Sequence, residues 1–521
     1  MKKTSAVATL KSIAPAALVL MIMAQSCRQS SSPQNTAPAI ADGQTLAKKY
    51  CVSCHQFPDP SLIDKKSWVN GVLPAMAKQL HIQNYMGQYF ADQGSTLSTA
   101  EWMKIVEWYK SKAPDSLVIP KPAVQPLADW AGFTLERPTQ VNQQMPAMTT
   151  MLTIDPASHL IYSADAANNF YSWDARLKPT LLHTFDSPVT GFEFTSSNHQ
   201  QAVVTCIGQM KPVDVSKGKI YLLNLGISEK SVPIAVADSL PRPVQTIQAD
   251  FNKDGLPDYV VCGFGHDRGG LYYIEQQADH HFKKKVMRPI PGGTQLIQGD
   301  FNHDGWQDVM CLFAQADEGI WMYLNDHRGG FTEQNLLHFP PIYGSGSFQL
   351  VDFNHDGKPD ILYTCGDNSD YSKVLKPYHG VYIFLNQGNW KFKQSYFYHI
   401  DGATKAIAAD FDGDGDFDIA AIAFFTDFKY HPAEGFTYLE QTGDNKFTAH
   451  QIPVYKYGRW ITMDVNDIDG DGNPDIVLGN FSIGQRGLLN QKGFTPEWDM
   501  HEPLIVLRNQ HKKQINSGSY K

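Results

Sequence analysis

The strongest constraint on the fold of this chain is a nine-residue acidic motif that occurs five times, with starts 50 to 58 residues apart. Each copy places an aspartate or asparagine at positions 1, 3, 5 and 9 and a glycine at position 6. A repeat of this length is typical of a solenoid or propeller, because each copy forms one supersecondary unit that packs against its neighbours. The five copies begin at Asp250, Asp300, Asp352, Asp410 and Asp467.

The side chains of the motif are those of a calcium loop. Oxygen ligands at alternating positions, a sharp turn at the glycine and a carbonyl at position 7 suit a hard divalent cation. An EF-hand would add a glutamate at position 12 and flanking helices, and position 12 holds no glutamate in any copy. A single copy would fit an ordinary solvated turn, but five in register indicate up to five calcium sites. The candidate ligands are Asp250, Asn252, Asp254, Asp258, Asp300, Asn302, Asp304, Asp308, Asp352, Asn354, Asp356, Asp360, Asp410, Asp412, Asp414, Asp418, Asp467, Asp469, Asp471 and Asp475.

The residues that flank the loops read as short strands, for example Tyr259–Cys262 and Ile361–Thr364. Loop and flanks together resemble the FG-GAP or VCBS repeats of integrin α-type propellers, and this resemblance implies one ion between the first two strands of a blade. Two upstream stretches, Met151–Tyr162 and Val189–Val204, have the same strand-turn-strand pattern without the aspartates. We therefore expect an all-β propeller of seven blades with about four strands each, over residues 129–508.

A different motif lies near the start of the chain, where Cys51-Val52-Ser53-Cys54-His55 has the C-x-x-C-H spacing that attaches a c-type haem. A zinc site would need a second pair of ligands, and the other downstream cysteines lie singly in the sequence. A thioredoxin-like motif would follow a strand, whereas residues 42–50 read as a short helix. The motif predicts one covalently bound haem c, with Cys51, Cys54 and His55 as cofactor-binding residues.

The sequence after this motif predicts a closing helix. Ser98 and Glu101 have the spacing of a capping box, and the next apolar residues follow the period of one helical face. They are Trp102, Ile105, Val106 and Tyr109.

The segment from Gly43 to Pro114 resembles a small all-α class I cytochrome c. That resemblance implies His55 as the proximal iron ligand and a methionine on the opposite side of the iron. We expect Met76 in that role, because the preceding proline fixes its approach, while Met86 and His81 stay open as alternatives.

The first residues have the pattern of a lipoprotein signal peptide over residues 1–26. Basic residues precede a short apolar run, Ala16–Ala24, which is too short for a conventional membrane span. Cys27 follows as the expected lipidation site, and residues 27–41 are a polar tether of Ser, Pro, Gln and Ala. We expect an exported protein, anchored by lipid to a bacterial membrane on the periplasmic side or at the cell surface.

The remaining boundaries follow from these segments: a haem domain over residues 42–114, a proline-containing linker over 115–128 and a C-terminal tail over 509–521. The formal net charge of −9 and the absence of a basic patch argue against nucleic-acid binding. The single cysteines of the propeller are expected to be buried free thiols, and disulfides between them stay open as an alternative in an oxidising compartment.

If strand direction alternates, the loops that join strands two to three and strand four to the next blade share the face opposite the calcium loops. This ligand face should carry a redox partner protein, a sugar or another small-molecule ligand. Its candidate segments are His266–Arg268, Tyr343, Asp367–His379, Asp427–His431 with Glu434, and Tyr455–Trp460.

Three functions are consistent with these features. The first is electron transfer by a haem protein whose propeller is a docking scaffold. The second is a periplasmic dehydrogenase whose propeller oxidises a small molecule or sugar and passes electrons to the haem. The third is an adhesion or glycan-binding lipoprotein. No nucleophile and base motif or second cofactor motif is present, so the electron carrier is favoured.

Overall fold

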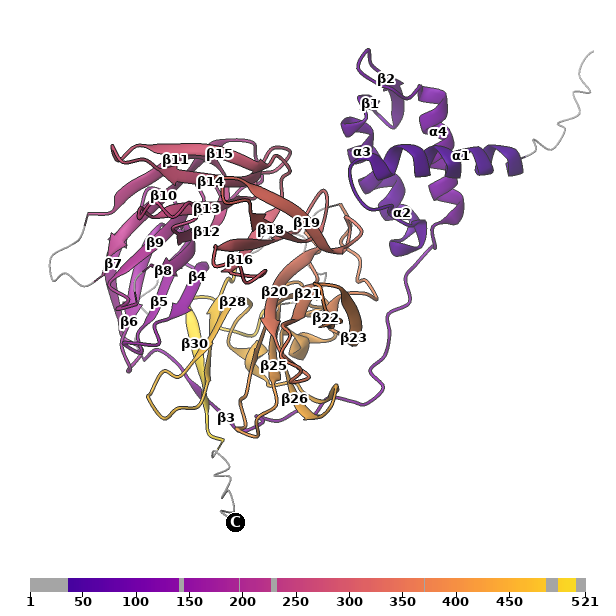
Figure 1. Cartoon of the computed structure of the whole chain (residues 1–521). Helices are drawn as coiled ribbons and strands as arrows, with labels where there is room; N and C mark the ends of the chain where they lie inside the picture. Colours follow the sequence, from indigo (N-terminus) through magenta and orange to yellow (C-terminus); the bar gives the residue numbers. More distant parts are fainter. Residues whose placement is uncertain are drawn as a thin grey trace, which may run out of the picture.

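The computed structural model describes residues 36–139, 145–195, 197–225, 232–369, 371–483 and 495–511. They form a helical N-terminal region followed by a β-propeller (Figure 1). The expected signal peptide, Cys27 and the first part of the tether lie outside the described residues. Among the described helices, none is long and apolar enough to cross a membrane.

The helical region is organised by two long helices that cross closely, α1 (Thr36–Tyr50) and α4 (Thr99–Lys112). A Cβ atom on Gly43 of α1 would lie 2.3 Å from the carbonyl oxygen of Lys104, so this crossing requires a glycine. The predicted capping box opens α4, because Ser98 Oγ accepts a hydrogen bond from the Glu101 N–H at 3.2 Å. Helix α1 begins at Thr36, inside the segment that was expected to be tether.

Between these helices the chain forms a shorter helical stretch and a hairpin. The apolar face predicted for α4 is buried, and Trp68 stacks on Tyr109 with ring centroids 4.3 Å apart. These side chains form one hydrophobic core with α1. The elements are a 3-10 turn at Cys51–Ser53, another at Pro60–Leu62, α2 (Lys65–Ser67), a π turn at Trp68–Val72, α3 (Leu73–Gln79), β1 (Ile82–Tyr85) and β2 (Gln88–Ala91).

The propeller has seven blades, each an antiparallel sheet of four strands, as the repeat predicted. Blades 1 and 2 lack the acidic motif but keep the strand-turn-strand pattern expected for them. Blade 1 is β4 (Thr149–Ile154), β5 (Ile161–Asp165), β6 (Asn169–Trp173) and β7 (Pro179–Thr184); blade 2 is β8 (Val189–Phe194), β9 (Gln201–Cys206), β10 (Ser216–Asn224) and β11 (Ile234–Pro241).

Blades 3 to 7 each contain one acidic motif. Blade 3 is β12 (Pro243–Ala249), β13 (Asp258–Gly263), β14 (Gly270–Gln276) and β15 (Phe282–Arg288); blade 4 is β16 (Gly293–Gly299), β17 (Asp308–Phe313), β18 (Gly319–Asn325) and β19 (Phe331–His338). Blade 5 is β20 (Ser345–Val351), β21 (Asp360–Cys365), β22 (Gly380–Asn386) and β23 (Phe392–His399); blade 6 is β24 (Ala403–Ala409), β25 (Asp418–Ala423), β26 (Phe436–Gly443) and β27 (Lys446–His450); blade 7 is β28 (Trp460–Asn466), β29 (Asp475–Asn480), β30 (Leu504–Asn509) and β3 (Phe133–Glu136).

Blade 7 joins the two ends of the propeller. Strand β3, which precedes blade 1 in sequence, pairs antiparallel with β30, and Phe133 lies opposite Asn509. The ring is therefore closed by hydrogen bonds between segments more than 360 residues apart, which stabilises it against opening at the join.

The linker is held against the propeller rather than free along its length. Leu127 accepts a hydrogen bond from the Gln451 N–H and donates one to the Ala449 carbonyl oxygen, both at 2.8 Å. The linker follows the outside of the ring down to β3 in Figure 1. This contact with blade 6 limits the motion expected of a proline-containing connection.

The propeller cysteines are buried free thiols, as expected, and two of them meet. Cys262 of β13 and Cys311 of β17 have their Sγ atoms 3.5 Å apart across two neighbouring blades. Burial raises the pKa of Cys262 well above its usual value, which keeps that thiol protonated.

Candidate functional site

The five acidic loops join the first and second strands of blades 3 to 7, where the repeat placed them. The glycine at position 6 has a φ between 80° and 101° in all five loops, a backbone conformation that glycine adopts without strain. Its N–H donates a hydrogen bond to the carboxylate at position 1. These bonds are Gly255 to Asp250 at 3.0 Å, Gly305 to Asp300 at 2.8 Å, Gly357 to Asp352 at 2.8 Å, Gly415 to Asp410 at 3.2 Å and Gly472 to Asp467 at 2.8 Å.

The aspartate at position 9 is buried in every loop and opens the second strand of its blade. In blade 4, Asp308 Oδ1 accepts the N–H of Asn325 at 2.8 Å and Oδ2 accepts the N–H of Phe301 at 3.0 Å. This carboxylate therefore ties the loop to the end of the third strand. The equivalent third-strand bonds are Gln276 to Asp258, Asn386 to Asp360, Gln441 to Asp418 and Asn509 to Asp475.

Burial raises the pKa of all five position-9 carboxyls, and that of Asp418 to about 7. A buried carboxylate beside other acidic groups is costly unless a positive charge lies close to it. A divalent cation would supply that charge in each loop.

Two of the loops bring three carboxylates together in a group that could hold a metal ion such as calcium. In each group one carboxylate oxygen from every member lies within 4.8 Å of the others. The groups are Asp410, Asp412 and Asp414 of blade 6, and Asp467, Asp469 and Asp475 of blade 7. In blades 3 to 5, position 3 is an asparagine, and its amide oxygen would be the metal ligand in place of a carboxylate oxygen.

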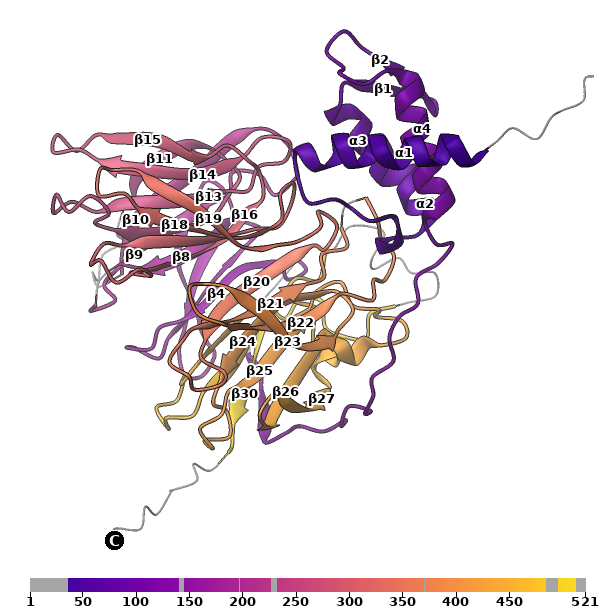
Figure 2. The ribbon, with the colours of Figure 1, turned by 45° about the vertical axis from the view of Figure 1, so that its right-hand side comes forward.

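The helical region lies on the opposite face of the propeller, over the loops predicted to form the ligand face (Figure 2). Lys78 Nζ is 2.6 Å from Asp267 Oδ2 in the β13–β14 loop. A Cβ on Gly71 would lie 2.3 Å from the carbonyl oxygen of Tyr371, and Ile342 packs against the helical core. Part of the predicted ligand face is therefore a contact within the chain.

The C-x-x-C-H motif follows directly on α1, with Cys51–Ser53 forming a single 3-10 turn. Both thiols are free; Cys54 is exposed, while burial raises the pKa of Cys51 to about 11. His55 Nδ1 lies 2.8 Å from the carbonyl oxygen of Gln56. A carbonyl can only accept, so Nδ1 carries the proton and Nε2 keeps a lone pair that can bind a metal.

His55 also lies close to blade 4 of the propeller. Burial lowers the pKa of His55, while the carboxylate of Asp317 and the ring of His338 act on it electrostatically in opposite directions. Asp317 Oδ1 is 2.6 Å from His338 Nε2. His55 is therefore near blade 4, while Val52 and Cys54 of the motif are exposed to solvent.

The three candidates for the second axial ligand occupy different surroundings. Met76 is on α3, partly exposed, and packs against the helical core. Met86 is at the tip of the β1–β2 hairpin, 88% exposed, with a φ of 51°. His81 has its Nδ1 atom 3.9 Å from Asp92 Oδ1. The choice of Met76 stays a prediction.

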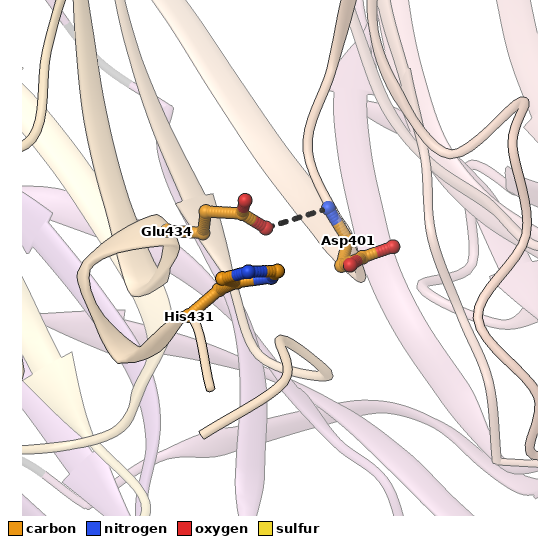
Figure 3. Close-up of side chains that lie close together, drawn as sticks. All are labelled: Asp401, His431 and Glu434. Carbon is orange, nitrogen blue, oxygen red and sulfur yellow. Dashed lines mark hydrogen bonds between the residues drawn. The ribbon is translucent and has the colours of Figure 1, made fainter. Parts of the chain in front are cut away.

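A second cluster of ligand-type side chains lies on the ligand face between blades 5 and 6. Asp401, His431 and Glu434 each offer one atom within 4.8 Å of the others, and their side chains converge in Figure 3. The Asp401 N–H donates to Glu434 Oε2 at 3.2 Å. Burial, and next the charge of Asp401, raises the pKa of Glu434 to about 7.

Other predicted residues of this face serve packing. The Arg459 guanidinium is buried and stacks on the Phe424 ring, 3.5 Å from its centroid. Tyr343 stacks on Tyr378 with ring centroids 4.5 Å apart. These side chains fill the face and support its loops.

Comparison with known proteins identifies the repeats. Residues 250–311 and 300–363 match the model described as an FG-GAP-like repeat. No curated protein matches the chain.

Solved β-propeller domains are similar to this chain at low identity. The β-propeller domain of Cps50 (Swd1) from Myceliophteria thermophila has 9% sequence identity and a TM-score of 0.43, and the match covers 72% of this chain and 99% of that chain. The WD40 β-propeller domain of Doa1 has 10% identity and a TM-score of 0.42, covering 72% and 96%.

The sequence indicated His431 and Glu434 but not Asp401 and its neighbour His399. His399 ends the last strand of blade 5 and Asp401 follows it, outside the acidic motif that marks each repeat. A histidine and an aspartate two residues apart at a strand end were the available signal. Only the arrangement of the blades places them beside a loop 30 residues later.

Proposed function

We propose that this chain is an exported, lipid-anchored haem c protein that transfers electrons, and that its calcium-stabilised propeller is a docking or ligand-binding scaffold. The observation that carries this proposal is the geometry of the C-x-x-C-H motif. Two free thiols lie one turn apart at the end of α1, and His55 is held by its Nδ1 contact with Nε2 free.

The donor set fits haem c better than it fits a metal ion. Cys51 and Cys54 would form the two thioether bonds, His55 would be the proximal ligand, and Met76 is the expected opposite ligand. When bound, the haem would supply a one-electron redox centre. The buried Nε1 atom of Trp102, which has no hydrogen-bond partner among the described residues, adds a donor inside the same core.

The residues around the motif keep its histidine in the required state. The Gln56 carbonyl orients the ring, and burial favours the neutral imidazole that a metal requires. Asp317 and His338 of blade 4 are near enough to act electrostatically on His55, so the propeller would influence the charge state of this ligand.

The test is an optical spectrum of the full chain, produced in cells that attach haem c, recorded oxidised and reduced. We expect a c-type difference spectrum and two thiols protected from alkylation. The Cys51→Ser, Cys54→Ser double variant should lose both, while the matched control Cys206→Ala should keep both. A colourless wild-type protein whose Cys51 and Cys54 react with alkylating reagent would exclude the proposal.

A second candidate function is supported by the docking of the helical region on the ligand face. A small molecule oxidised at that face would lie on the same side of the propeller as the C-x-x-C-H motif. The protein would then be a dehydrogenase, and adding its sugar or related substrate would reduce its own haem. Absence of reduction across a substrate screen, with reduction by a small protein donor, would favour the electron carrier.

A further inference from the structure

We propose that His399, Asp401, His431 and Glu434 form a separate metal site that binds one divalent transition metal ion such as zinc. The site lies on the ligand face of the propeller, between blades 5 and 6. It depends neither on the haem nor on the calcium loops.

The four side chains come from two loops that the blade arrangement brings together. His399 ends β23, and Asp401 follows in the loop to β24. His431 and Glu434 belong to the loop between β25 and β26, where the 3-10 turn Pro432–Gly435 places them three residues apart on one side. His399 Nε2 is 3.2 Å from Asp401 Oδ1.

Two buried polar groups of this cluster lack hydrogen-bond partners among the residues that the structure describes. They are Asp401 Oδ1, on a side chain 2% exposed, and both ring nitrogens of His399. The two groups lie close together without forming a hydrogen bond. Buried polar groups nearly always have a hydrogen-bond partner, so a cation bound by both would satisfy lone pairs that the 3.2 Å contact between them leaves without one.

A third unpaired group extends this observation. His379 is fully buried, neither ring nitrogen has a partner among the described residues, and it interacts electrostatically with His399. Its backbone is next to that of His399, because Ile400 donates its N–H to the His379 carbonyl oxygen at 3.2 Å. His379 is therefore a buried neighbour of His399 on the side away from solvent.

The mixture of donors selects the metal. Two imidazoles and two carboxylates suit zinc and similar ions, whereas calcium takes oxygen ligands. Atoms bound to one zinc ion at about 2.1 Å lie at most about 4.2 Å apart. Asp401, His431 and Glu434 each offer one atom within 4.8 Å of the others, so these side chains must draw together to bind one zinc ion. His399 would join them from beside Asp401, with its Nε2 3.2 Å from Asp401 Oδ1.

The exposure of the cluster indicates what such an ion would do. Asp401 is buried, Glu434 is half-buried and His431 is exposed. The inner side of the ion would be held by protein and the outer side would face solvent. Four protein donors fill the tetrahedral shell of zinc, so a water or an oxygen-bearing small molecule would bind as a fifth ligand on the solvent side.

The experiment is zinc titration of the full chain by calorimetry after chelation, with metal analysis of the product. Calcium is restored to about 10 mM first, so that the acidic loops are filled at the weak affinities of extracellular modules. The thiols of the motif are alkylated if they are free, or the Cys51→Ser, Cys54→Ser variant is used, so that sulfur ligands are excluded. We expect one zinc ion per chain with a Kd in the micromolar range or lower.

Three variants locate the site. His431→Ala removes an exposed donor and Glu434→Gln keeps the shape of its side chain, and each should weaken zinc binding at least tenfold. His281→Ala, an exposed histidine in the β14–β15 hairpin, is the matched control and should bind zinc as the wild type does. Thermal unfolding in calcium checks that all three variants are folded.

A measurement on the wild type avoids dependence on any variant. X-ray absorption at the zinc edge should report nitrogen and oxygen ligands without sulfur. The proposal is overturned if no zinc binds in excess calcium, if His431→Ala and Glu434→Gln bind it as tightly as the control, or if sulfur ligands are found.

Discussion

The two faces of the propeller are built on different principles. On the acidic-loop face, each site is one continuous nine-residue segment. In five blades the carboxylates at positions 1 and 9 accept the same backbone hydrogen bonds. On the ligand face, the cluster around Asp401 combines two loops from neighbouring blades and, within the part of the chain that the structure describes, occurs at one blade junction. The helical region covers another part of that face through Lys78 and Gly71.

This difference suggests that one face stabilises the fold and the other could bind a specific ligand. A motif repeated in blades 3 to 7 stabilises each loop against its own third strand and makes these five blades alike. A cluster that requires two particular blades makes one junction unlike the others. Function in a propeller is therefore expected where the repeat is broken, because ligand binding needs an asymmetric site.

The largest expected effect tests the acidic-loop face by removing calcium. With dissociation constants of 0.1 to 1 mM, each site at 10 mM calcium would stabilise the fold by roughly 1.4 to 2.7 kcal/mol. Five filled sites would then contribute on the order of 10 kcal/mol. Calorimetry should show a much lower Tm with chelator than with calcium. Equal stabilisation by the same concentration of magnesium would contradict selective calcium binding.

The next prediction separates the two roles of an acidic loop. Asp308→Ala leaves the buried N–H of Asn325 and the partly buried N–H of Phe301 without their acceptor, which should cost about 2 to 4 kcal/mol. This loss should appear with or without calcium. Asp304→Ala, at position 5 of the same loop, is the matched control. It removes only exposed contacts, including those with the Trp306 N–H at 2.9 Å and with His327 Nε2 at 2.8 Å, and should mainly reduce the stabilisation that calcium adds.

Chemical denaturation in calcium and in chelator measures both variants. If Asp308→Ala were as stable as wild type in chelator, the position-9 carboxylate would serve only as a metal ligand. If Asp304→Ala kept the full calcium response, position 5 would not be a ligand.

The sequence was sufficient for the features that are local. The glycine at position 6 and the carboxylates around it fix the loop because a turn and its side-chain acceptors lie within nine residues. The same locality explains the capping box at Ser98 and Glu101, which the structure contains. Seven blades followed from counting such units, including two that lack the aspartates.

The sequence was not sufficient where contacts join distant segments. The pairing of β3 with β30, the position of Leu127 on blade 6 and the meeting of Asp401 with His431 all depend on how the ring closes. Each brings together residues whose local patterns are ordinary. The start of α1 at Thr36 was missed for a different reason, because a polar composition rich in alanine also permits a helix.

The next prediction concerns the pH dependence of stability that one residue of the ligand face should cause. Glu318 is fully buried in the β17–β18 loop. Burial raises the pKa of Glu318 to about 8, although Ser345 and Gly344 donate hydrogen bonds to its carboxylate. The folded state therefore keeps a proton that the unfolded chain releases near pH 4.5. The free energy of unfolding should fall as pH rises from about 4.5 to about 8, by at most roughly 1.4 kcal/mol per pH unit.

Glu318→Gln removes this titration and keeps the size of the side chain. Denaturation at several pH values, at constant calcium, should show a flatter profile for the variant between pH 5 and 8. Glu107→Gln on the exposed surface of α4 is the control and should retain the wild-type slope. An identical slope in Glu318→Gln would show that this carboxyl does not hold its proton in the folded protein.

The smallest expected effect concerns the contact between the helical region and the ligand face. Lys78 and Asp267 are partly exposed and paired at 2.6 Å, so their attraction should be weak and screened by salt. Lys78→Asp should increase protease cleavage within residues 115–128 at low ionic strength, because the helical region separates more often from the propeller. Adding Asp267→Lys should restore protection by reversing the pair.

Lys110→Asp, which affects a pair within α4, is the control. Cleavage that rises equally in Lys78→Asp and Lys110→Asp would show that net charge, not docking, sets protease access, and the ligand face would then be open in solution.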